Sequence, residues 1–146
     1  MKVSGTSFVI LVCAIVLISG VYAQNVDTNA GYSVTPAGNL ILPSVILPMS
    51  AGTISQGQTV YYSKYVLPGT TSLVPDLNWG DTSDSLTLTI SAPDATLGPY
   101  SDASDGVING RIYLSVSKHS GLTAGTWYFR VYGERVNGVQ SYSFVV

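Results

Sequence analysis

The sequence is poor in the residues that carry most protein chemistry. It has one cysteine (Cys13), one histidine (His119) and one glutamate (Glu134) among its 146 residues. Cys13 lies in an N-terminal apolar run that the sequence predicts to be removed, so the mature chain has no thiol, no disulfide and no thiolate metal site. The mature chain must therefore depend on its own buried core, which a domain of about 100–150 residues can form.

Charged residues are also scarce and make up 10% of the chain. From Gln24 onward, eight acidic residues stand against five basic ones, and the basic residues form no stripe. Nucleic-acid binding depends on clustered Lys and Arg side chains that contact phosphate. We therefore expect no nucleic-acid partner.

The residues needed for catalysis are thinly spread. A hydrolase needs a positioned nucleophile and base, or two carboxylates with separated pKa values. His119 lies in a predicted loop and Glu134 lies near a predicted turn, while no serine lies in a Gly-x-Ser-x-Gly motif. Asp81 begins an Asp-Thr-Ser triplet that lacks the glycine of an aspartic-protease loop. We expect a protein that is not an enzyme.

The N-terminus has the features of a secretory signal. Lys2 precedes an uninterrupted apolar run at 8–18, and the triplet Val-Tyr-Ala ends at residue 23. A membrane anchor is the alternative, but the run is shorter than the roughly 20 residues that span a bilayer. We expect residues 1–23 to be a cleaved signal peptide. The protein is then secreted, extracellular or at the cell surface, with no membrane span after cleavage.

The segment that follows differs from the rest of the chain. Residues 24–46 contain Pro36 and Pro43 and have little charge. Proline has no N–H to donate to a strand ladder, so this composition is typical of an extended connector or an edge strand. We predict an extended lead-in at 24–46, with its apolar side chains along the domain rather than free, and a single domain at 47–146.

From residue 54 onward, apolar and polar residues alternate with a period of two, and turn residues recur at regular intervals. This pattern predicts an all-β protein, a compact antiparallel β-sandwich. The clearest strands, at 84–91 and 111–117, place on their inward faces Leu86, Leu88, Ile90, Ile112, Leu114 and Val116. Further strands are predicted at 58–67 and at 71–79, where Pro75 marks an edge or bulge, and turns at 68–70, 79–84 and 93–106.

Residues 125–146 predict two strands joined by a two-residue turn. Asn137-Gly138 tolerates the positive φ angles of a type I′ turn, so Val136 is predicted to pair with Val139. That register places one apolar set inward, namely Trp127, Phe129, Val131, Tyr142, Phe144 and Val146. We therefore predict a closing hairpin whose inner face belongs to the core.

The outer face of this predicted hairpin carries the candidate binding residues. Tyr128, Arg130 and Tyr132 must point outward, and Tyr113 shares that exposure if its strand lies in the same sheet. Tyr and Arg supply contact area, hydrogen bonds and cation–π stacking at the centres of interfaces. The alternative is a structural ladder of cross-strand aromatic pairs, which stabilises a sheet without any ligand.

Three acidic residues offer a candidate metal site. Asp94, Asp102 and Asp105 lie in a glycine-containing segment whose carboxylates and carbonyls are the hard oxygen ligands that calcium prefers. The spacing is not that of an EF-hand loop, and Asp, Ser and Gly are also the residues of any exposed turn. We expect a domain that requires no cofactor, with calcium at these residues as the alternative to a solvated turn.

Several strand motifs resemble those of a known family. GTWYFRVYG followed by GVQSYSF is similar to the C-terminal strands of the bacterial and archaeal pre-peptidase C-terminal (PPC) domain family. ISQGQTVYYSKYVL resembles its opening strand, and DSLTLTISAPD resembles its Leu-x-Leu strand that runs into Pro-Asp. Ala95 stands where the family often has glycine, and residues 1–49 contain no peptidase. The resemblance covers about residues 50–146.

This resemblance implies a β-sandwich of jelly-roll type that assists targeting, binding or maturation of secreted enzymes. We therefore expect a secreted, non-catalytic accessory or binding module that contacts a cell-surface polymer or a secreted protein. The alternative is a structural or adhesion building block of the cell envelope, joined by edge pairing of strands. A monomer retained by a polymer would favour the binding module, whereas concentration-dependent multimers without a ligand would favour the building block.

Overall fold

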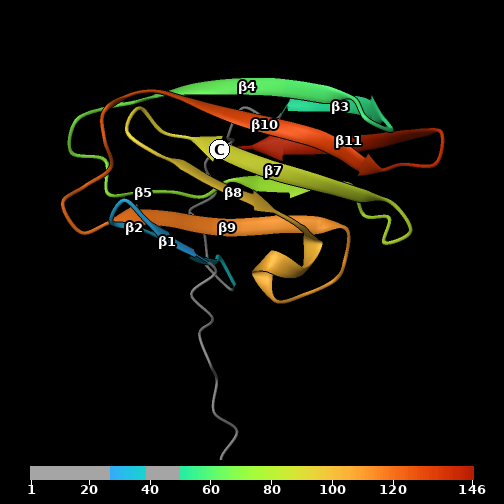
Figure 1. The fold of residues 1–146 in the computed structure, drawn as a ribbon, viewed down its shortest axis with the longest axis horizontal. Coiled ribbons are helices and arrows are strands. Elements are labelled where there is room, and N and C mark those ends of the chain that lie inside the picture. The colour runs from blue at the N-terminus through green and yellow to red at the C-terminus, as the bar shows by residue number, and fades with distance from the viewer. Residues whose placement is uncertain (1–26, 39–49) are drawn as a thin grey trace, which may run out of the picture.

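The computed structural model describes residues 27–38 and 50–146, which form two antiparallel β-sheets packed face to face (Figure 1). This arrangement confirms the predicted all-β sandwich. The predicted signal peptide and much of the predicted lead-in lie outside the described residues. Within the described part of the chain, no helix is long and apolar enough to cross a membrane.

The larger sheet has the strand order β1-β2-β9-β6-β11-β3, and β5 pairs with β9 beside this path. Its strands are β1 (Asp27–Asn29), β2 (Tyr32–Pro36), β3 (Ser50–Ser55), β5 (Ser72–Leu73), β6 (Asp76–Asn78), β9 (Arg111–Lys118) and β11 (Val139–Val145). The smaller sheet has the order β4-β10-β7-β8. Its strands are β4 (Thr59–Val66), β7 (Ser85–Ser91), β8 (Thr96–Tyr100) and β10 (Gly125–Arg135), and one 3₁₀ turn, η1 (Asp102–Asp105), follows β8.

The strand order is that of a jelly roll. Without β1, β2 and β5, the two sheets have the orders β3-β11-β6-β9 and β4-β10-β7-β8. Apart from the β7–β8 pair, each consecutive strand of this set crosses from one sheet to the other. Two four-stranded antiparallel sheets connected in this way form the jelly-roll architecture. As a result, strands that are far apart in the sequence become neighbours within each sheet.

The described part of the predicted lead-in belongs to the sandwich. β1 and β2 extend the larger sheet beyond β9, and Val34 of β2 lies opposite Val116 of β9. The side chains of Tyr32 and Val34 point into the core and are almost completely buried. Alternate residues of a strand point to the same face, so these two side chains attach β2 to the core. The sandwich therefore includes residues before residue 47, the predicted start of the domain.

The predicted closing hairpin is wrong, because β10 and β11 lie in opposite sheets. β10 pairs with β4 and β7, whereas β11 pairs with β3 and β6. A type I′ turn needs positive φ at both central residues, but only Gly138 has one, at 77°. The backbone N–H of Val136 donates to Oε1 of Gln56 (2.6 Å), and that of Asn137 donates to Oδ1 of Asp84 (3.0 Å). These two side chains hold the chain where it crosses between the sheets.

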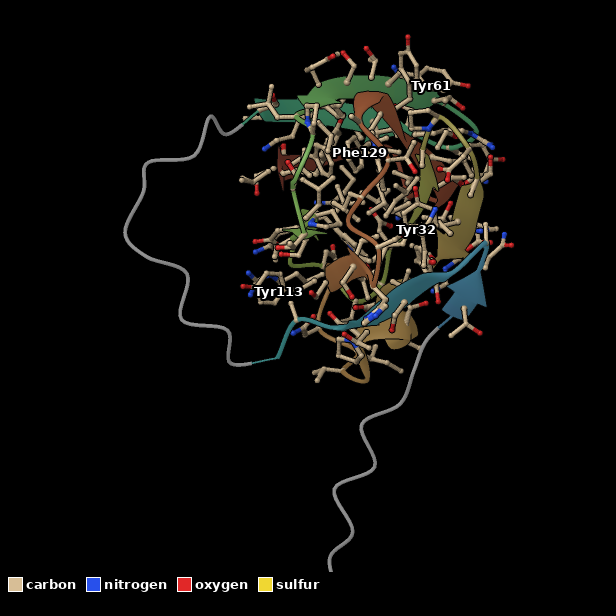
Figure 2. All side chains as sticks on the ribbon, turned by 90° about the vertical axis from the view of Figure 1, so that its left-hand side faces the viewer. Tyr32, Tyr61, Tyr113 and Phe129 are labelled. Carbon is tan, nitrogen blue, oxygen red and sulfur yellow. The ribbon has the colours of Figure 1, made fainter. Side chains whose placement is uncertain are left out.

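The inward faces of these two strands were nevertheless predicted correctly. Trp127, Phe129 and Val131 of β10 are fully buried, and Figure 2 shows Phe129 between the two sheets. Phe144 of β11 meets Phe129 from the opposite sheet, with 5.4 Å between the ring centroids. Both strands bury one face in the same core. The alternation therefore identified the buried face of each strand but not the strand beside it.

Most of the other predicted strands are confirmed. β7 lies within the segment 84–91, β9 covers the segment 111–117 and continues to Lys118, and the predicted inward residues of both strands are buried. The segment 58–67 contains β4. The segment 71–79 divides into β5 and β6, which lie on either side of Pro75. Proline has no N–H for a ladder bond, which explains the interruption.

The turn predicted over 93–106 is wrong in part, because Thr96–Tyr100 forms the edge strand β8. Leu97 and Tyr100 are the buried residues of this strand. Two residues, Gly98 and Pro99, separate them, so the strand lacks the strict alternation that identified β7 and β9. Both residue types are also typical of turns, and the short strand was therefore hidden in the sequence.

Candidate functional site

Five side chains of β4 and β10 lie on the outer face of the smaller sheet. Because alternate residues of a strand share a face, the buried positions of β10 leave the residues between them exposed to the outside. The antiparallel register then places Arg130 of β10 opposite Tyr61 of β4. We name this set the tyrosine face, and its members are Tyr61, Tyr65, Tyr128, Arg130 and Tyr132. Figure 2 shows Tyr61 at the outer surface, away from the core residue Phe129.

The tyrosine face is accessible to a ligand. The exposed fractions are 65% for Tyr61, 63% for Tyr65 and 51% for Tyr128, and Tyr132 is half-buried. The guanidinium of Arg130 lies 5.3 Å from the ring centroid of Tyr132, which is a cation–π contact. Among the residues that the structure describes, no carboxylate forms an ion pair with Arg130. The face therefore combines aromatic surface, phenol hydroxyls and one cation that a ligand can contact.

The cross-strand neighbours of the four tyrosines are not aromatic. Tyr61 lies opposite Arg130, and the other three tyrosines lie opposite hydroxylated residues. These neighbours are Thr126 for Tyr65, Ser63 and Ser91 for Tyr128, and Thr59 and Thr87 for Tyr132. Diagonal aromatic neighbours can also interact across strands, but no ring contact joins any two of these four tyrosines. The observed register therefore favours an arrangement for contact over an internal aromatic ladder.

Tyr113 does not belong to the tyrosine face. Its strand, β9, lies in the larger sheet, so the condition under which it would share the exposure of β10 is not met. The Tyr113 ring instead contacts the guanidinium of Arg111, which lies 4.3 Å from the ring centroid. Arg111 also forms two hydrogen bonds of 2.7 Å with Asp76. Figure 2 shows Tyr113 well away from Tyr61.

Sequence reasoning missed two members of the tyrosine face, Tyr61 and Tyr65. They are separated by an even number of residues within the strand predicted at 58–67, so the sequence predicts that they share one face. The pairing of β4 with β10 was not predictable, because these strands are far apart in the sequence. Only the folded sheet brings the two pairs of tyrosines together.

The carboxylate of Asp102 organises the loop between η1 and β9. Its Oδ1 accepts three hydrogen bonds of 3.1 Å, from the backbone N–H groups of Asn109, Gly110 and Arg111. Asp105 accepts two further backbone hydrogen bonds in the same region. A carboxylate that accepts backbone N–H groups in this way satisfies donors that a turn leaves unpaired.

The three candidate calcium ligands do not meet at one place. Asp94 contacts Lys118, apart from Asp102 and Asp105, and the described residues contain no group of three or more His, Cys, Asp or Glu side chains that could hold a metal. Calcium binding at Asp102 and Asp105 stays a prediction. If calcium binds there, it should raise the melting temperature, and a chelator should reverse this rise. The melting temperature of Asp102→Asn should not respond to calcium.

Asp94 belongs to a hydrogen-bonded cluster that links β2, β9 and the segment before β8. Its Oδ1 accepts a hydrogen bond from the Tyr32 hydroxyl (2.5 Å), and its Oδ2 accepts from Lys118 Nζ (2.7 Å) and the Thr123 hydroxyl (2.8 Å). Lys118 Nζ also lies 4.2 Å from the ring centroid of Tyr32. Burial opposes ionisation, but the hydrogen bonds from Lys118, Tyr32 and Thr123 outweigh it and lower the pKa of Asp94 to about 2.

This cluster predicts a loss of stability in acid. The pKa of Asp94 is about 2 in the folded protein and 3.8 as a free side chain. The ionised Asp94 side chain therefore adds to the free energy of unfolding above about pH 4, and this contribution is lost as the pH falls through 2. The side chain is 37% exposed, so solvent screening limits the contribution to about 1 kcal/mol. Urea unfolding of wild type and Asp94→Asn tests this. The difference in free energy of unfolding between wild type and Asp94→Asn should become smaller by about 1 kcal/mol as the pH falls from about 6 to 2. A difference that does not change with pH would contradict the lowered pKa of Asp94.

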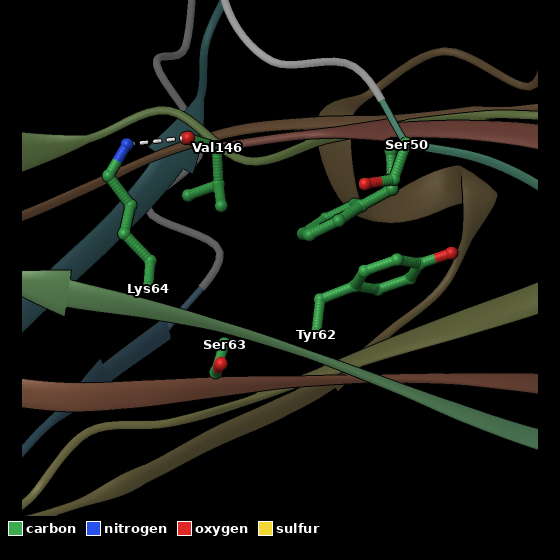
Figure 3. Close-up of a pocket in the computed structure, with 6 residues that line it drawn as sticks. Ser50, Tyr62, Ser63, Lys64 and Val146 are labelled. Atoms are coloured by element: carbon green, nitrogen blue, oxygen red, sulfur yellow. Dashed lines mark hydrogen bonds between the residues drawn. The ribbon is translucent and has the colours of Figure 1, made fainter.

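A pocket of about 280 Å³ opens between β4 and the end of β11 (Figure 3). It is lined by Ser50, Tyr62, Ser63, Lys64, Phe144 and Val146. Lys64 Nζ donates a hydrogen bond of 2.5 Å to the backbone oxygen of Val146. The Tyr62 hydroxyl lies 2.8 Å from that of Tyr142, and the Tyr62 ring packs 4.9 Å from the ring centroid of Phe144. The main polar side chains of this pocket are thus paired within the protein.

The fold and the tyrosine face define the class of protein: a jelly-roll β-sandwich with an aromatic outer surface on its smaller sheet. No protein-family model matches the chain, and no curated protein matches it.

Proposed function

We propose that this protein is a secreted, non-catalytic binding module, related to PPC domains, that contacts a cell-surface polymer through the tyrosine face. The observation that carries this proposal is an outward surface of four tyrosines around one arginine. The jelly-roll strand order agrees with the fold that the PPC resemblance implies, which supports the relation to that family.

The tyrosine face suits an extended ligand. Tyr61 and Tyr65 lie four residues apart on β4, as do Tyr128 and Tyr132 on β10, which corresponds to about 13 Å along each strand. A polymer that lies across the sheet can therefore contact several rings at once. Tyrosine offers large contact area at a low cost in side-chain entropy, and the hydroxyl groups of Ser63 and Ser91 on neighbouring strands offer hydrogen bonds.

The test is retention of the purified protein on a washed cell-envelope fraction from the organism that makes it. Replacing both Tyr128 and Tyr132 with threonine should reduce retention about tenfold or more, since exposed aromatic anchors dominate binding energy. Threonine is compatible with strands, so the melting temperature should change by at most about 5 °C. Tyr113→Thr, in the opposite sheet, is the matched control and should keep its retention.

Two further outcomes decide the proposal and the class of polymer. If the double variant binds as well as wild type but melts much lower, the tyrosine face is structural and the proposal is wrong. If binding depends on the tyrosines, protease digestion of the envelope fraction identifies the partner. Retention that survives digestion indicates a polysaccharide, and retention that is lost indicates a protein.

A further inference from the structure

Within the described part of the chain, the edge strand β4 is open over its whole length. β4 is the last strand of the smaller sheet and pairs with β10 on one side. Among residues 27–38 and 50–146, no strand pairs with its other side, and β4 forms the upper margin of the molecule in Figure 1. At eight residues, it is the longest of the four edge strands. A free strand edge carries unpaired N–H and C=O groups that another chain can pair with.

The other edges are less suited to pairing. β8, at the far edge of the same sheet, contains Pro99, which has no N–H, and its register with β7 is interrupted. β1 is three residues long, and β3 carries only small side chains except for the buried Ile54. Natural edges are also protected by outward lysines, but Lys64 of β4 is held by the backbone oxygen of Val146 instead.

The sequence of β4 is complementary to itself in the antiparallel direction. If a two-fold axis passes through Ser63, Tyr61 of one copy lies opposite Tyr65 of the other, and the reverse pair forms on the far side of the axis. Lys64 then lies opposite Tyr62 of the second copy. Aromatic cross-strand pairs stabilise a sheet, and this register keeps the two Lys64 ammonium groups, each held by Val146 of its own copy, from facing each other. An axis through Lys64 would oppose two ammonium groups, and an axis through Tyr62 would lose the Tyr61–Tyr65 pairs.

We propose that two copies of this protein form a dimer by antiparallel pairing of their β4 strands about a two-fold axis at Ser63. The pairing joins two four-stranded sheets into one continuous sheet and places the two tyrosine faces on the same side of it. The same patch is used by both copies, so assembly stops at two. This inference goes beyond the proposed function and does not rest on it, because the pairing needs no ligand. An association that stops at two differs from the open-ended multimers that an envelope building block would form, so it is compatible with a binding module.

The first test uses a disulfide at the axis. Opposed residues of an antiparallel pair have Cα atoms about 4.5–5.5 Å apart, within the range that a disulfide spans. The secreted chain lacks Cys13, so Ser63→Cys introduces its single thiol. We expect oxidation to link this variant into dimers at least about tenfold faster than Thr126→Cys, an equally outward position on β10. Equal linking rates for the two variants would overturn the proposed axis.

The second test uses charge at the same residue. In analytical ultracentrifugation, wild type should show a concentration-dependent dimer, and Ser63→Lys and Ser63→Asp should each weaken it about tenfold, because like charges then face each other. An equimolar mixture of the two variants should dimerise at least as well as wild type. Thr126→Lys, which adds the same charge away from the edge, should dimerise normally. A wild-type protein that stays monomeric up to about 1 mM, or a mixture that does not dimerise, would overturn the proposal.

Discussion

Replacing Phe129 with alanine is expected to lower the free energy of unfolding by about 3–5 kcal/mol. Phe129 is fully buried on β10, and its ring lies 5.4 Å from that of Phe144 in the opposite sheet. Removing the ring leaves a cavity at the contact between the two sheets, and the sheets cannot close this space because their strands are hydrogen-bonded at fixed register. Chemical denaturation followed by tryptophan fluorescence measures the loss.

The neighbouring residue supplies the control for this prediction. Tyr128 differs from Phe129 by one position but points outward and is 51% exposed. Tyr128→Ala should therefore cost about 1 kcal/mol or less, although its aromatic area is similar. The difference between the two losses of stability shows which face of β10 points into the core. Similar losses for the two variants would mean that Tyr128 is buried and would contradict both the sandwich interface and the tyrosine face.

The second large effect is expected at Gly133, where alanine should cost about 3 kcal/mol or more. An alanine Cβ at this position would lie 2.3 Å from the backbone oxygen of Ser55, a distance that no relaxed structure keeps. Gly133 also donates its N–H to the oxygen of Gln58 and accepts a hydrogen bond from the N–H of Gly57. The turn between β3 and β4 therefore sits directly against this residue, and the added methyl group must push the two apart.

Gly138→Ala is the matched glycine control. Gly138 has a positive φ of 77°, but no atom lies within 4 Å of the added Cβ. Its replacement should cost about 1–2 kcal/mol from backbone strain alone. Thermal melting of both variants separates steric conflict from strain. If Gly133→Ala is as stable as wild type, the turn between β3 and β4 does not lie against β10 as described.

Phe129 and Gly133 both lie in β10, whose predicted pairing with β11 was wrong. Val136-Asn137-Gly138-Val139 has the composition of a tight hairpin turn, and the flanking strands both bury alternate residues. The local turn signal and the alternation were thus both present, although β10 and β11 do not pair with each other. The competing contacts come from Gln56 and Asp84, which are distant in the sequence and bind the backbone of the crossing segment. No local pattern in residues 125–146 contains that information.

In the candidate site, too, the buried and exposed faces were predictable from the sequence, whereas the neighbouring strands were not. Tyr128, Arg130 and Tyr132 were predictable because a strand with Trp127, Phe129 and Val131 buried must expose the residues between them. Tyr113 was assigned conditionally, and the condition failed because β9 lies in the other sheet. The acidic residues were predictable as turn residues, whereas the separation of Asp94 from Asp102 depends on the path of β8 between them.

The sequence alone determined the all-β class and, in β7, β9, β10 and β11, which side of each strand is buried. Those properties depend on the alternation of side chains along one strand, and this alternation is local. The tertiary structure alone decided which strands are neighbours, since strand pairing joins residues across long stretches of chain. For that reason the tyrosine face, which needs β4 beside β10, exists only in the folded sheet.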